Sequence, residues 1–519
     1  MRIKAQKINQ KISELWKDTP EYVPDRAALK KENALSRWDA AFLICIGLFL
    51  FFLSWELPFN GGPDEALRYK ICQFICRHGT LPVGDEPEIL DKLWGISYAF
   101  QPYIPFIAGG WLMRLAGIFT TADKALLMAA RLPNILLGIA FYWQVLLISR
   151  RLFARGIYRI FFVALLVLLP QLLYLFVYVN LDGMALFASA FLIETWLEGM
   201  KYRWDRASCT RLGAGVAVCA LSYYNAYGYI LMSIVLFAVS LGRLYLKKGA
   251  AVAFRIVVRR GLYVSVLALL LAGWWFVRSA ILYDGDFLGM KASAACAEEH
   301  AQEEYKPSVK QSVKEQGIPL KQMLKNDLEG GMGWMRVTWW SFIGFFGFLE
   351  YPLGADIYEI HKLVFAFGAL GMFAEGFLTL LSGIRSRKAG KAGFGQEGQF
   401  LLRICFLCCM IIPVLLALIY AYTSDYQAQG RYLMPMVVPL MYFTAEGISR
   451  IMGLIREKWL VCVLMLLQVY ALLHVFLAAF VTVYLPSFDP GFSALAGITI
   501  PWVWNQGIVQ RALHMLIPG

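Results

Sequence analysis

The chain has 519 residues, of which 59% are hydrophobic, 15% aromatic and 16% charged. Soluble domains carry about 25% charged residues, so this composition excludes a disordered or collagen-like chain and argues against a soluble enzyme. It predicts an all-α, polytopic integral membrane protein, whose apolar residues face lipid as well as a core. The net charge of +13 fits basic loops on the cytoplasmic side of a membrane, so no nucleic-acid partner is expected.

The apolar runs predict about eleven transmembrane helices, each near the roughly 20 residues that cross a bilayer. Residues 1–38 precede them and are expected to form a basic cytoplasmic tail. The expected spans are Ala40–Phe59, Ala125–Ser149, Ile157–Val179, Met184–Met200, a pair within Leu212–Leu246 that turns near Asn225, Leu262–Leu282, Leu363–Ile384, Phe400–Tyr422, Leu433–Ile451 and Leu460–Tyr484.

Pro102–Phe119 is also apolar, but the charges of the flanking loops argue against a crossing there. If this segment stays on one side, the basic clusters all face the cytoplasm, as the positive-inside rule requires. These clusters are the N-terminal tail and the groups that begin at Arg150, Lys201, Arg243, Arg385 and Arg450. Pro102–Phe119 is therefore predicted to be a re-entrant or interfacial helix on the outer side.

This topology places the N-terminus in the cytoplasm and the C-terminus outside. The transmembrane domain is expected over residues 39–485. It includes two large outer loops, 58–124 with juxtamembrane helices and 283–361, and it is followed by an outer C-terminal segment, 486–519.

The first outer loop opens with Asn60-Gly-Gly-Pro-Asp-Glu-Ala-Leu-Arg68. Pro63 suits the first position of a helix, which would put Asp64 and Glu65 in the first turn, where the helix dipole stabilises their charged forms. Arg68 follows Asp64 by four residues and so shares its face. The motif is typical of a helix N-terminus with a local ion pair, or of a catalytic carboxylate at the outer end of the first span.

Other polar residues recur where expected spans end on the outer side. Each alone is typical of a helix cap or of a snorkelling side chain. Together they predict a polar recess on the outer face, because ionisable groups at membrane depth usually line a cavity or pathway. They are Asn180, Asp182, Arg278, Asp284, Asp286, Asp425, Gln429, Arg431 and Tyr432. Glu194 lies near the cytoplasmic side of a span and is interpreted as structural.

The order of these motifs resembles the GT-C superfamily of membrane glycosyltransferases. Pro63-Asp64-Glu65 after the first span is similar to that group's acidic motif. Ala130-Arg-Leu-Pro133 and Ser149-Arg-Arg-Leu-Phe153 resemble the branch of the protein O-mannosyltransferases and the lipid A aminoarabinose transferase. With Asn180-x-Asp182-Gly183, Trp274-Trp275-x-x-Arg278 and Gln429-Gly-Arg-Tyr432, residues 40–450 are most similar to an uncharacterised bacterial membrane-protein family of this superfamily.

The resemblance implies an inverting glycosyltransferase of the cell envelope in a bacterial plasma membrane. Its donor would be a sugar on polyprenyl phosphate, and its acceptor an extracytoplasmic glycan, lipid or protein. Asp64 would be the catalytic base and Glu65 its neighbour. Asp182 occupies the place of an acidic residue that binds a divalent metal in some relatives, so Asp64 and Asp182 would hold Mg²⁺ or Mn²⁺ if a metal takes part. Gln101 stands where the aminoarabinose transferase has a lysine and is assigned to the substrate site.

A departing phosphate also needs cations, and arginine can hold phosphate through two hydrogen bonds. Arg68, Arg278 and Arg431 are the candidates, and Gln429 and Tyr432 complete the expected substrate site. No P-loop, GxSxG or HExxH motif is present, which fits a donor that arrives in the membrane. The alternatives are a transporter or flippase of a lipid-linked or small polar substrate, and a non-catalytic assembly protein on the same fold.

Overall fold

The computed structural model describes residues 26–325, 333–382, 396–455 and 459–475. The chain divides into two compact units, Met1–Leu472 and Leu473–Gly519, and the first is described below. The expected outer segment 486–519 and residues 1–25 of the expected cytoplasmic tail lie outside the described residues.

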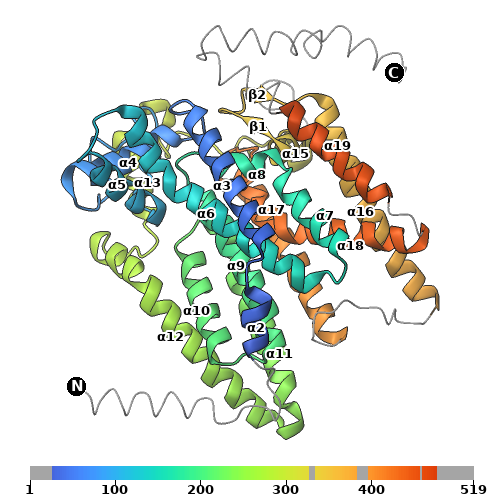
Figure 1. The fold of residues 1–519 in the computed structure, drawn as a ribbon. Helices are drawn as coiled ribbons and strands as arrows, with labels where there is room; N and C mark the ends of the chain where they lie inside the picture. The colour runs from blue at the N-terminus through green and yellow to red at the C-terminus, as the bar shows by residue number, and fades with distance from the viewer. Residues whose placement is uncertain (1–25, 326–332, 383–395, 456–458, 476–519) are drawn as a thin grey trace, which may run out of the picture. The chain divides into compact units, whose positions relative to one another are not determined.

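Helices form almost all of the regular structure in the described chain (Figure 1). In chain order they are α2 (Arg26–Asn33), α3 (Arg37–Glu56), α4 (Glu65–His78), α5 (Ile104–Ala116), α6 (Asp123–Leu152), α7 (Gly156–Val167), α8 (Pro170–Tyr174), α9 (Asp182–Lys201), α10 (Arg206–Ala220), η1 (Tyr224–Ala226), α11 (Gly228–Tyr245), η2 (Leu246–Lys248), α12 (Ala250–Leu282), α13 (Met290–His300), η3 (Glu303–Tyr305), α14 (Leu320–Lys325), α15 (Trp334–Ile343), α16 (Ala355–Ser382), α17 (Gln396–Thr423), η4 (Gly430–Met436), α18 (Val437–Ile455) and α19 (Trp459–Val475). Two short strands, β1 (Phe345–Phe346) and β2 (Tyr351–Pro352), pair antiparallel.

Six described segments are long and apolar enough to cross a membrane, which indicates a multi-pass membrane protein. They are Arg37–Glu56, Asp123–Leu152, Tyr224–Lys248, Ala250–Leu282, Ala355–Ala374 and Glu397–Thr423. The expectation of about eleven spans is therefore not confirmed. Two of the expected spans, Ile157–Val179 and Leu460–Tyr484, contain described apolar helices that are shorter than this, Gly156–Val167 and Val461–Leu473.

The expected span Ile157–Val179 is not one helix. Helix α7 ends at Val167, and the short α8 starts at Pro170. Proline has no backbone N–H, and it disfavours helical geometry in the residue before it, so the apolar run breaks here. The chain then continues through the buried, non-helical residues 175–180. This break turns the chain toward Asp182, so it affects the site as well as the fold.

Two other expected spans are helices of suitable length that carry charged residues. Glu194 in α9 has no exposed surface and pairs with Arg151 and Arg211. Glu446 in α18 pairs with Arg403 at 3.2 Å. Because these charges are compensated inside the protein, the helices are held by packing and ion pairs as well as by apolar surface. The arrangement agrees with the structural interpretation of Glu194.

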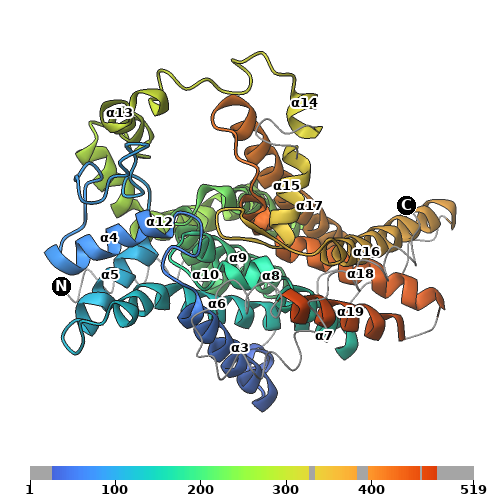
Figure 2. The ribbon, with the colours of Figure 1, turned by 90° about the horizontal axis from the view of Figure 1, so that it is seen from above.

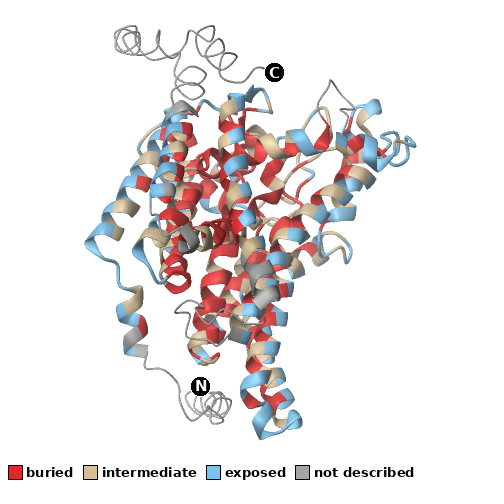
Figure 3. Ribbon diagram, turned by 90° about the vertical axis from the view of Figure 1, so that its right-hand side faces the viewer, coloured by how far each residue is buried: buried red, intermediate tan, exposed pale blue. Residues whose placement is uncertain are grey.

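Helix α9 lies at the centre of the described fold. It contacts α6, α10, α11 and η4, and nearly every residue from Asp182 to Met200 is buried. Figure 3 shows buried residues concentrated among the inner helices and exposed residues on the outer ones. The start of α9 therefore reaches the interior, where its first residue, Asp182, meets side chains from other helices.

Pro102–Phe119 contains the 13-residue helix α5. At 1.5 Å per residue it is about 20 Å long, which is shorter than the roughly 30 Å hydrocarbon core of a bilayer. It packs against α4 and α6, and a Cβ on Gly110 would come within 2.7 Å of Ile75. Helix α5 is thus short and closely packed, and its place on the outer side of a membrane stays a prediction.

The chain after α12 folds over the ends of other helices. Figure 2 shows the segment that follows α13 reaching across to α14, beside the end of α17. There Lys310 forms an ion pair with Asp425, and Lys314 N donates to Tyr422 O at 3.1 Å. This segment therefore ties the loop after α12 to the loop that precedes η4.

Candidate active site

The turn between α3 and α4 has a backbone that few residues adopt. Asn60 and Asp64 have φ of 61° and 60°, in the left-handed region that Asn and Asp tolerate better than other non-glycine residues. A Cβ on Gly62 would come within 2.4 Å of the Tyr178 ring, so this position needs glycine. Helix α4 begins at Glu65, so Asp64 stands just before the helix and not within the first turn, as the sequence suggested for Pro63-Asp64-Glu65.

The Asp64 carboxylate lies between two arginines that are far apart in the sequence. Its Oδ2 accepts a hydrogen bond from Arg431 Nη2 at 2.8 Å and one from Arg68 Nη2 at 3.3 Å. Both arginines are 4% exposed. Burial would raise the pKa of Asp64, but Arg431, Arg68 and the nearby Tyr98 side chain outweigh it and hold the pKa at about 2. Asp64 is therefore ionised at neutral pH.

Asp182 belongs to the same group of charges. It is 3% exposed, and it interacts electrostatically with Arg431, Arg68 and Asp64. It starts α9, just before the expected span Met184–Met200, and its burial raises the pKa of its carboxyl. Side chains from α4, α9 and η4 therefore lie in one group beside Asp64.

Asn180 and Asn134 hold the loop that presents Asp182. Asn180 Oδ1 accepts from Gly183 N at 3.0 Å and so caps the start of α9. Asn134 Nδ2, in α6, donates to the carbonyl oxygens of Tyr178 and Asn180. These side chains satisfy backbone groups that the break after α7 leaves outside a helix.

The Gln429-Gly-Arg-Tyr432 motif forms the start of η4. Gly430 N donates to Ser341 Oγ at 2.6 Å, and a Cβ on Gly430 would meet Phe342 N at 2.1 Å. This close approach to α15 fixes the backbone that carries Arg431. Tyr432 Oη accepts a second bond from Arg431 Nη2 at 3.2 Å, and the Tyr432 ring lies 5.1 Å from the guanidinium carbon.

Several polar atoms in this group are buried without a hydrogen-bond partner among the described residues. They are Arg68 Nε, Arg431 Nε and Nη1, Asp182 Oδ1 and Gln429 Oε1. The Tyr178 hydroxyl lies near Arg431, but it also has no hydrogen-bond partner among the described residues. Buried polar groups are almost always paired. Arg68 and Arg431 therefore have N–H groups available to donate to a ligand with oxygen acceptors.

Glu65 has different partners from its neighbour Asp64. Its two oxygens accept from Arg131 Nε and Nη2, both at 2.7 Å, and Oε1 also accepts from Val179 N at 3.1 Å. Arg131 donates as well to the carbonyl oxygens of Ser54, Leu57 and Pro58. All five N–H groups of Arg131 are used, and Glu65 has no exposed surface. Glu65 therefore has a structural role: its hydrogen bonds hold the first turn of α4 in place beside Asp64.

Arg278 and Gln101 do not take part in the hydrogen bonds of the Asp64 group. Arg278 Nη2 donates to Pro82 O at 2.7 Å, and its guanidinium lies 5.2 Å from the Trp275 ring. Gln101 is half-buried, just before α5. Among the expected phosphate contacts, Arg68 and Arg431 are therefore brought together with Asp64, whereas Arg278 holds the first outer loop.

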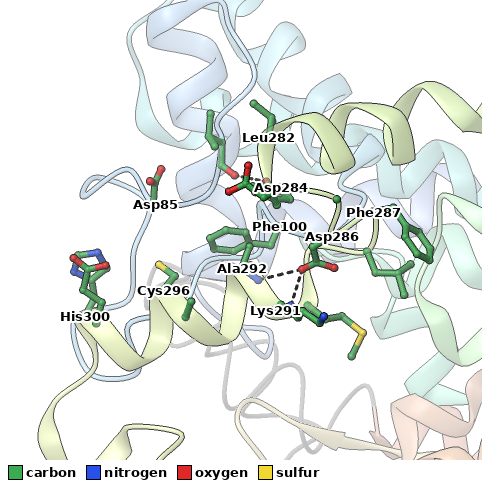
Figure 4. Close-up of a pocket in the computed structure, with 17 residues that line it drawn as sticks. Asp85, Phe100, Leu282, Asp284, Asp286, Phe287, Lys291, Ala292, Cys296 and His300 are labelled. Carbon is green, nitrogen blue, oxygen red and sulfur yellow. Dashed lines mark hydrogen bonds between the residues drawn. The ribbon is translucent and has the colours of Figure 1, made fainter.

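A cavity of about 980 Å³ lies beside that loop and the end of α12 (Figure 4). Asp85, Asp284, Asp286 and Phe100 are among its lining residues. Asp286 Oδ2 accepts from the backbone N–H groups of Lys291 and Ala292, so it serves the start of α13. The expected recess residues Asp284 and Asp286 line this cavity, which does not include Asp64 or Arg431 among its lining residues.

The described residues do not fit a divalent-metal site at Asp64 and Asp182. No group of three His, Cys, Asp or Glu side chains that could hold a metal ion occurs in the described part of the chain. Asp64 Oδ2 already accepts from two guanidinium groups, and a cation between the two carboxylates would face both arginines. No step below is assigned to Mg²⁺ or Mn²⁺.

Sequence reasoning missed four side chains that shape this site: Tyr98, Arg131, Asn134 and Tyr178. Arg131 stood in the Ala130-Arg-Leu-Pro133 motif, and a buried arginine inside an apolar helix is itself a signal. Asn134 follows it by three residues and so shares its face. Nothing in the local sequence pointed to Tyr98 or Tyr178, because their contacts come from distant segments.

No protein-family model matches the chain, and no curated protein matches it. Solved structures with a similar fold include an archaeal oligosaccharyltransferase and ArnT. The oligosaccharyltransferase of Archaeoglobus fulgidus in its apo form aligns with a TM-score of 0.43 and 13% identity over 84% of this chain and 55% of that chain. The same enzyme, AglB, in complex with an inhibitory peptide and a dolichol-phosphate, aligns with a TM-score of 0.43 and 12% identity over the same shares.

ArnT from Cupriavidus metallidurans in the apo state aligns with a TM-score of 0.31 and 14% identity over 78% of this chain and 77% of that chain. The chain spans about half the length of the oligosaccharyltransferase, 55% of it. These likenesses are distant and concern the fold alone, so the site described above rests on its own contacts.

Proposed function

We propose that this chain is an inverting GT-C-type glycosyltransferase. It moves a sugar from a polyprenyl-phosphate donor to a glycan, lipid or protein acceptor on the outer face of a bacterial plasma membrane. The observation that carries the proposal is the pair of buried arginines, Arg68 and Arg431, which hold Asp64 and still have N–H groups without a partner.

These N–H groups suit a phosphate better than other ligands. A phosphate presents several oxygen acceptors, and arginine binds it with charge-assisted hydrogen bonds. Two guanidinium groups beside Asp64 and Asp182 leave little net charge in the group, so the phosphate would be recognised through hydrogen bonds to the unpaired N–H groups. A polyprenyl tail would lie among the apolar helices, so that the phosphate reaches the arginines without leaving the membrane.

The reaction needs one base and one stabilised leaving group. The acceptor hydroxyl oxygen attacks the anomeric carbon from the face opposite the phosphate, and a new carbon–oxygen bond forms as the bond to the phosphate oxygen breaks. Asp64 takes the hydroxyl proton. Arg68 and Arg431 stabilise the charge on the departing polyprenyl phosphate. The attack from the opposite face inverts the configuration of the sugar.

The basic loops support the orientation. With the N-terminus inside, the turn that carries Asp64 follows the first span on the outer side. Asp182 and Arg431 lie in the same group of contacts. A donor presented on the outer leaflet would meet all three.

The test is to extract lipid-linked sugars from cells with and without this protein. The proposal expects one polyprenyl-phosphate sugar to accumulate in the deletion strain and to return to its normal level when the wild-type chain is restored. An unchanged pool would contradict it. Movement of the carrier across the membrane by the purified protein, without transfer of its sugar, would favour a flippase instead.

A further inference from the structure

Arg68 and Arg431 both bind the Asp64 carboxylate through their Nη2 nitrogen. In both residues Nη2 donates to Asp64 Oδ2. Arg431 Nη2 also donates to Tyr432 Oη, so both of its hydrogens are engaged. Arg68 Nη1 donates to Pro63 O at 3.0 Å.

A guanidinium group grips an oxyanion through two parallel N–H groups. Each of its two paired edges includes Nη2, together with either Nε or Nη1. Arg131 uses this geometry on Glu65, through Nε and Nη2. Arg431 Nε and Nη1, the second nitrogen of each edge, have no hydrogen-bond partner. Nη2, which both edges share, already donates to Asp64. A phosphate that takes two bonds from Arg431 must therefore compete for Nη2.

The charges of the group also make the phosphate compete with Asp64 for the two arginines. The two guanidinium groups already face the carboxylates of Asp64 and Asp182. A phosphate adds a third anion for the same two cations. The Asp64 side chain is 27% exposed, whereas Asp182 is 3% exposed, so water can replace the arginines on Asp64 more easily than on Asp182.

We propose that the donor phosphate and Asp64 share Arg68 and Arg431, so that arrival of the phosphate draws the arginines away and frees the Asp64 carboxylate to accept the acceptor's proton. This rests on the proposed function. The base is held by two cations while the site is empty, and it becomes effective when the donor is in place. Donor binding therefore precedes productive acceptor binding.

Tyr98 keeps Asp64 in position during this exchange. Its side chain interacts with the Asp64 carboxylate, and its ring lies 4.8 Å from the guanidinium carbon of Arg68.

A carboxylate held by two arginines accepts a proton poorly, which agrees with the pKa of about 2 for Asp64. Loss of one or both arginines would make it a stronger base.

The test measures binding of undecaprenyl phosphate, which carries no sugar to transfer, to the purified full chain in phosphatidylcholine nanodiscs. Asp64→Asn replaces the charged acceptor of both Nη2 groups with a neutral amide oxygen, which competes more weakly. It should tighten binding about tenfold, because hydrogen bonds to charged groups contribute that much or more. Asp182→Asn is the matched control. It changes the other carboxyl of the same group, but Asp182 takes no hydrogen bond from either Nη2, so its effect should be clearly smaller.

Equal or weaker binding by Asp64→Asn would overturn the inference, and so would equal tightening in both variants, which would mean that charge removal alone matters. Asp64→Gly, which also suits a φ of 60°, gives a second variant if Asp64→Asn does not fold. Thermal unfolding reports folding of each variant. If the folded wild-type chain does not bind undecaprenyl phosphate at all, the proposed function fails and this inference fails with it.

Discussion

Asp64 and Glu65 are adjacent acidic residues, each held by arginine, yet their environments differ. Glu65 lies in a closed arrangement, in which Arg131 uses every N–H group and the carboxylate is fully buried. Asp64 lies in an open one, in which Arg68 and Arg431 have N–H groups without a partner. The closed pair stabilises the fold, whereas the open group has bonding capacity for a ligand. A carboxylate–arginine contact is thus informative about function only when all its polar atoms are counted.

The largest effect is expected from breaking the closed pair. Arg131→Ala leaves the Glu65 carboxylate buried without a partner and should cost about 3–5 kcal/mol of stability, which thermal unfolding in detergent would measure. Lys362→Ala is the control, because its ion pair with Glu359 is exposed and exposed pairs contribute little. Equal unfolding temperatures for the two variants would show that the Glu65 pair is not structural.

Substitutions in the open group should lower activity far more than they lower stability. Asp64→Asn should lower the rate of sugar transfer on the order of a hundredfold or more, because general-base catalysis contributes that much. Asn tolerates the φ of 60° at this position, so the protein should remain folded. The measurement is transfer from a synthetic polyprenyl-phosphate sugar. A folded Asp64→Asn protein with full transfer activity would reject Asp64 as the base.

Arg431 and Arg278 were both expected to contact phosphate, and their contacts in the structure separate them. Arg431→Ala should weaken binding of polyprenyl phosphate by roughly ten- to a hundredfold. Arg278→Ala should have a smaller effect, because that guanidinium donates to Pro82 O and packs on Trp275. Binding in nanodiscs measures both. If neither substitution changes the affinity, the assignment of arginines to the phosphate fails.

Acid should weaken the open group through a defined pH window. The folded-state pKa of Asp64 is about 2, below its ordinary value of 3.8. A group whose pKa is lowered by folding adds stability above its unfolded pKa, and this is lost as pH falls through the folded value. The wild-type chain should therefore lose on the order of 2 kcal/mol relative to Asp64→Asn between about pH 4 and pH 2. Parallel unfolding curves for the two proteins over this range would contradict the ion pairs of Asp64.

The apolar runs predicted the positions of most helices but not which of them are continuous. Local composition could place Ile157–Val179 in a membrane, yet Pro170 breaks the helix, and the side chains of Asn134 and Asn180 satisfy the buried, non-helical backbone that follows. The apolar run hides the break, because the residues after it are as apolar as those before it. The sequence also showed Glu194 and Glu446 within expected spans, but it did not show which arginines pair with them.

The site was predictable in its motifs and less so in its geometry. The Pro-Asp-Glu and Gln-Gly-Arg-Tyr motifs indicated the residues that meet, although Asp64 and Arg431 are 367 positions apart. The sequence did not reveal that Glu65 is closed off by Arg131, or that Arg278 turns to Pro82. Both outcomes depend on long-range packing, which the spacing of residues along one helix does not report.

The central claim is that Arg68 and Arg431 receive the phosphate of a lipid carrier beside Asp64. A cryo-electron microscopy structure of the chain in nanodiscs with bound undecaprenyl phosphate tests this most directly. The account predicts density for the phosphate within hydrogen-bonding distance of both guanidinium groups. Phosphate density elsewhere, such as in the cavity lined by Asp284, with Asp64 still paired to both arginines, would contradict it.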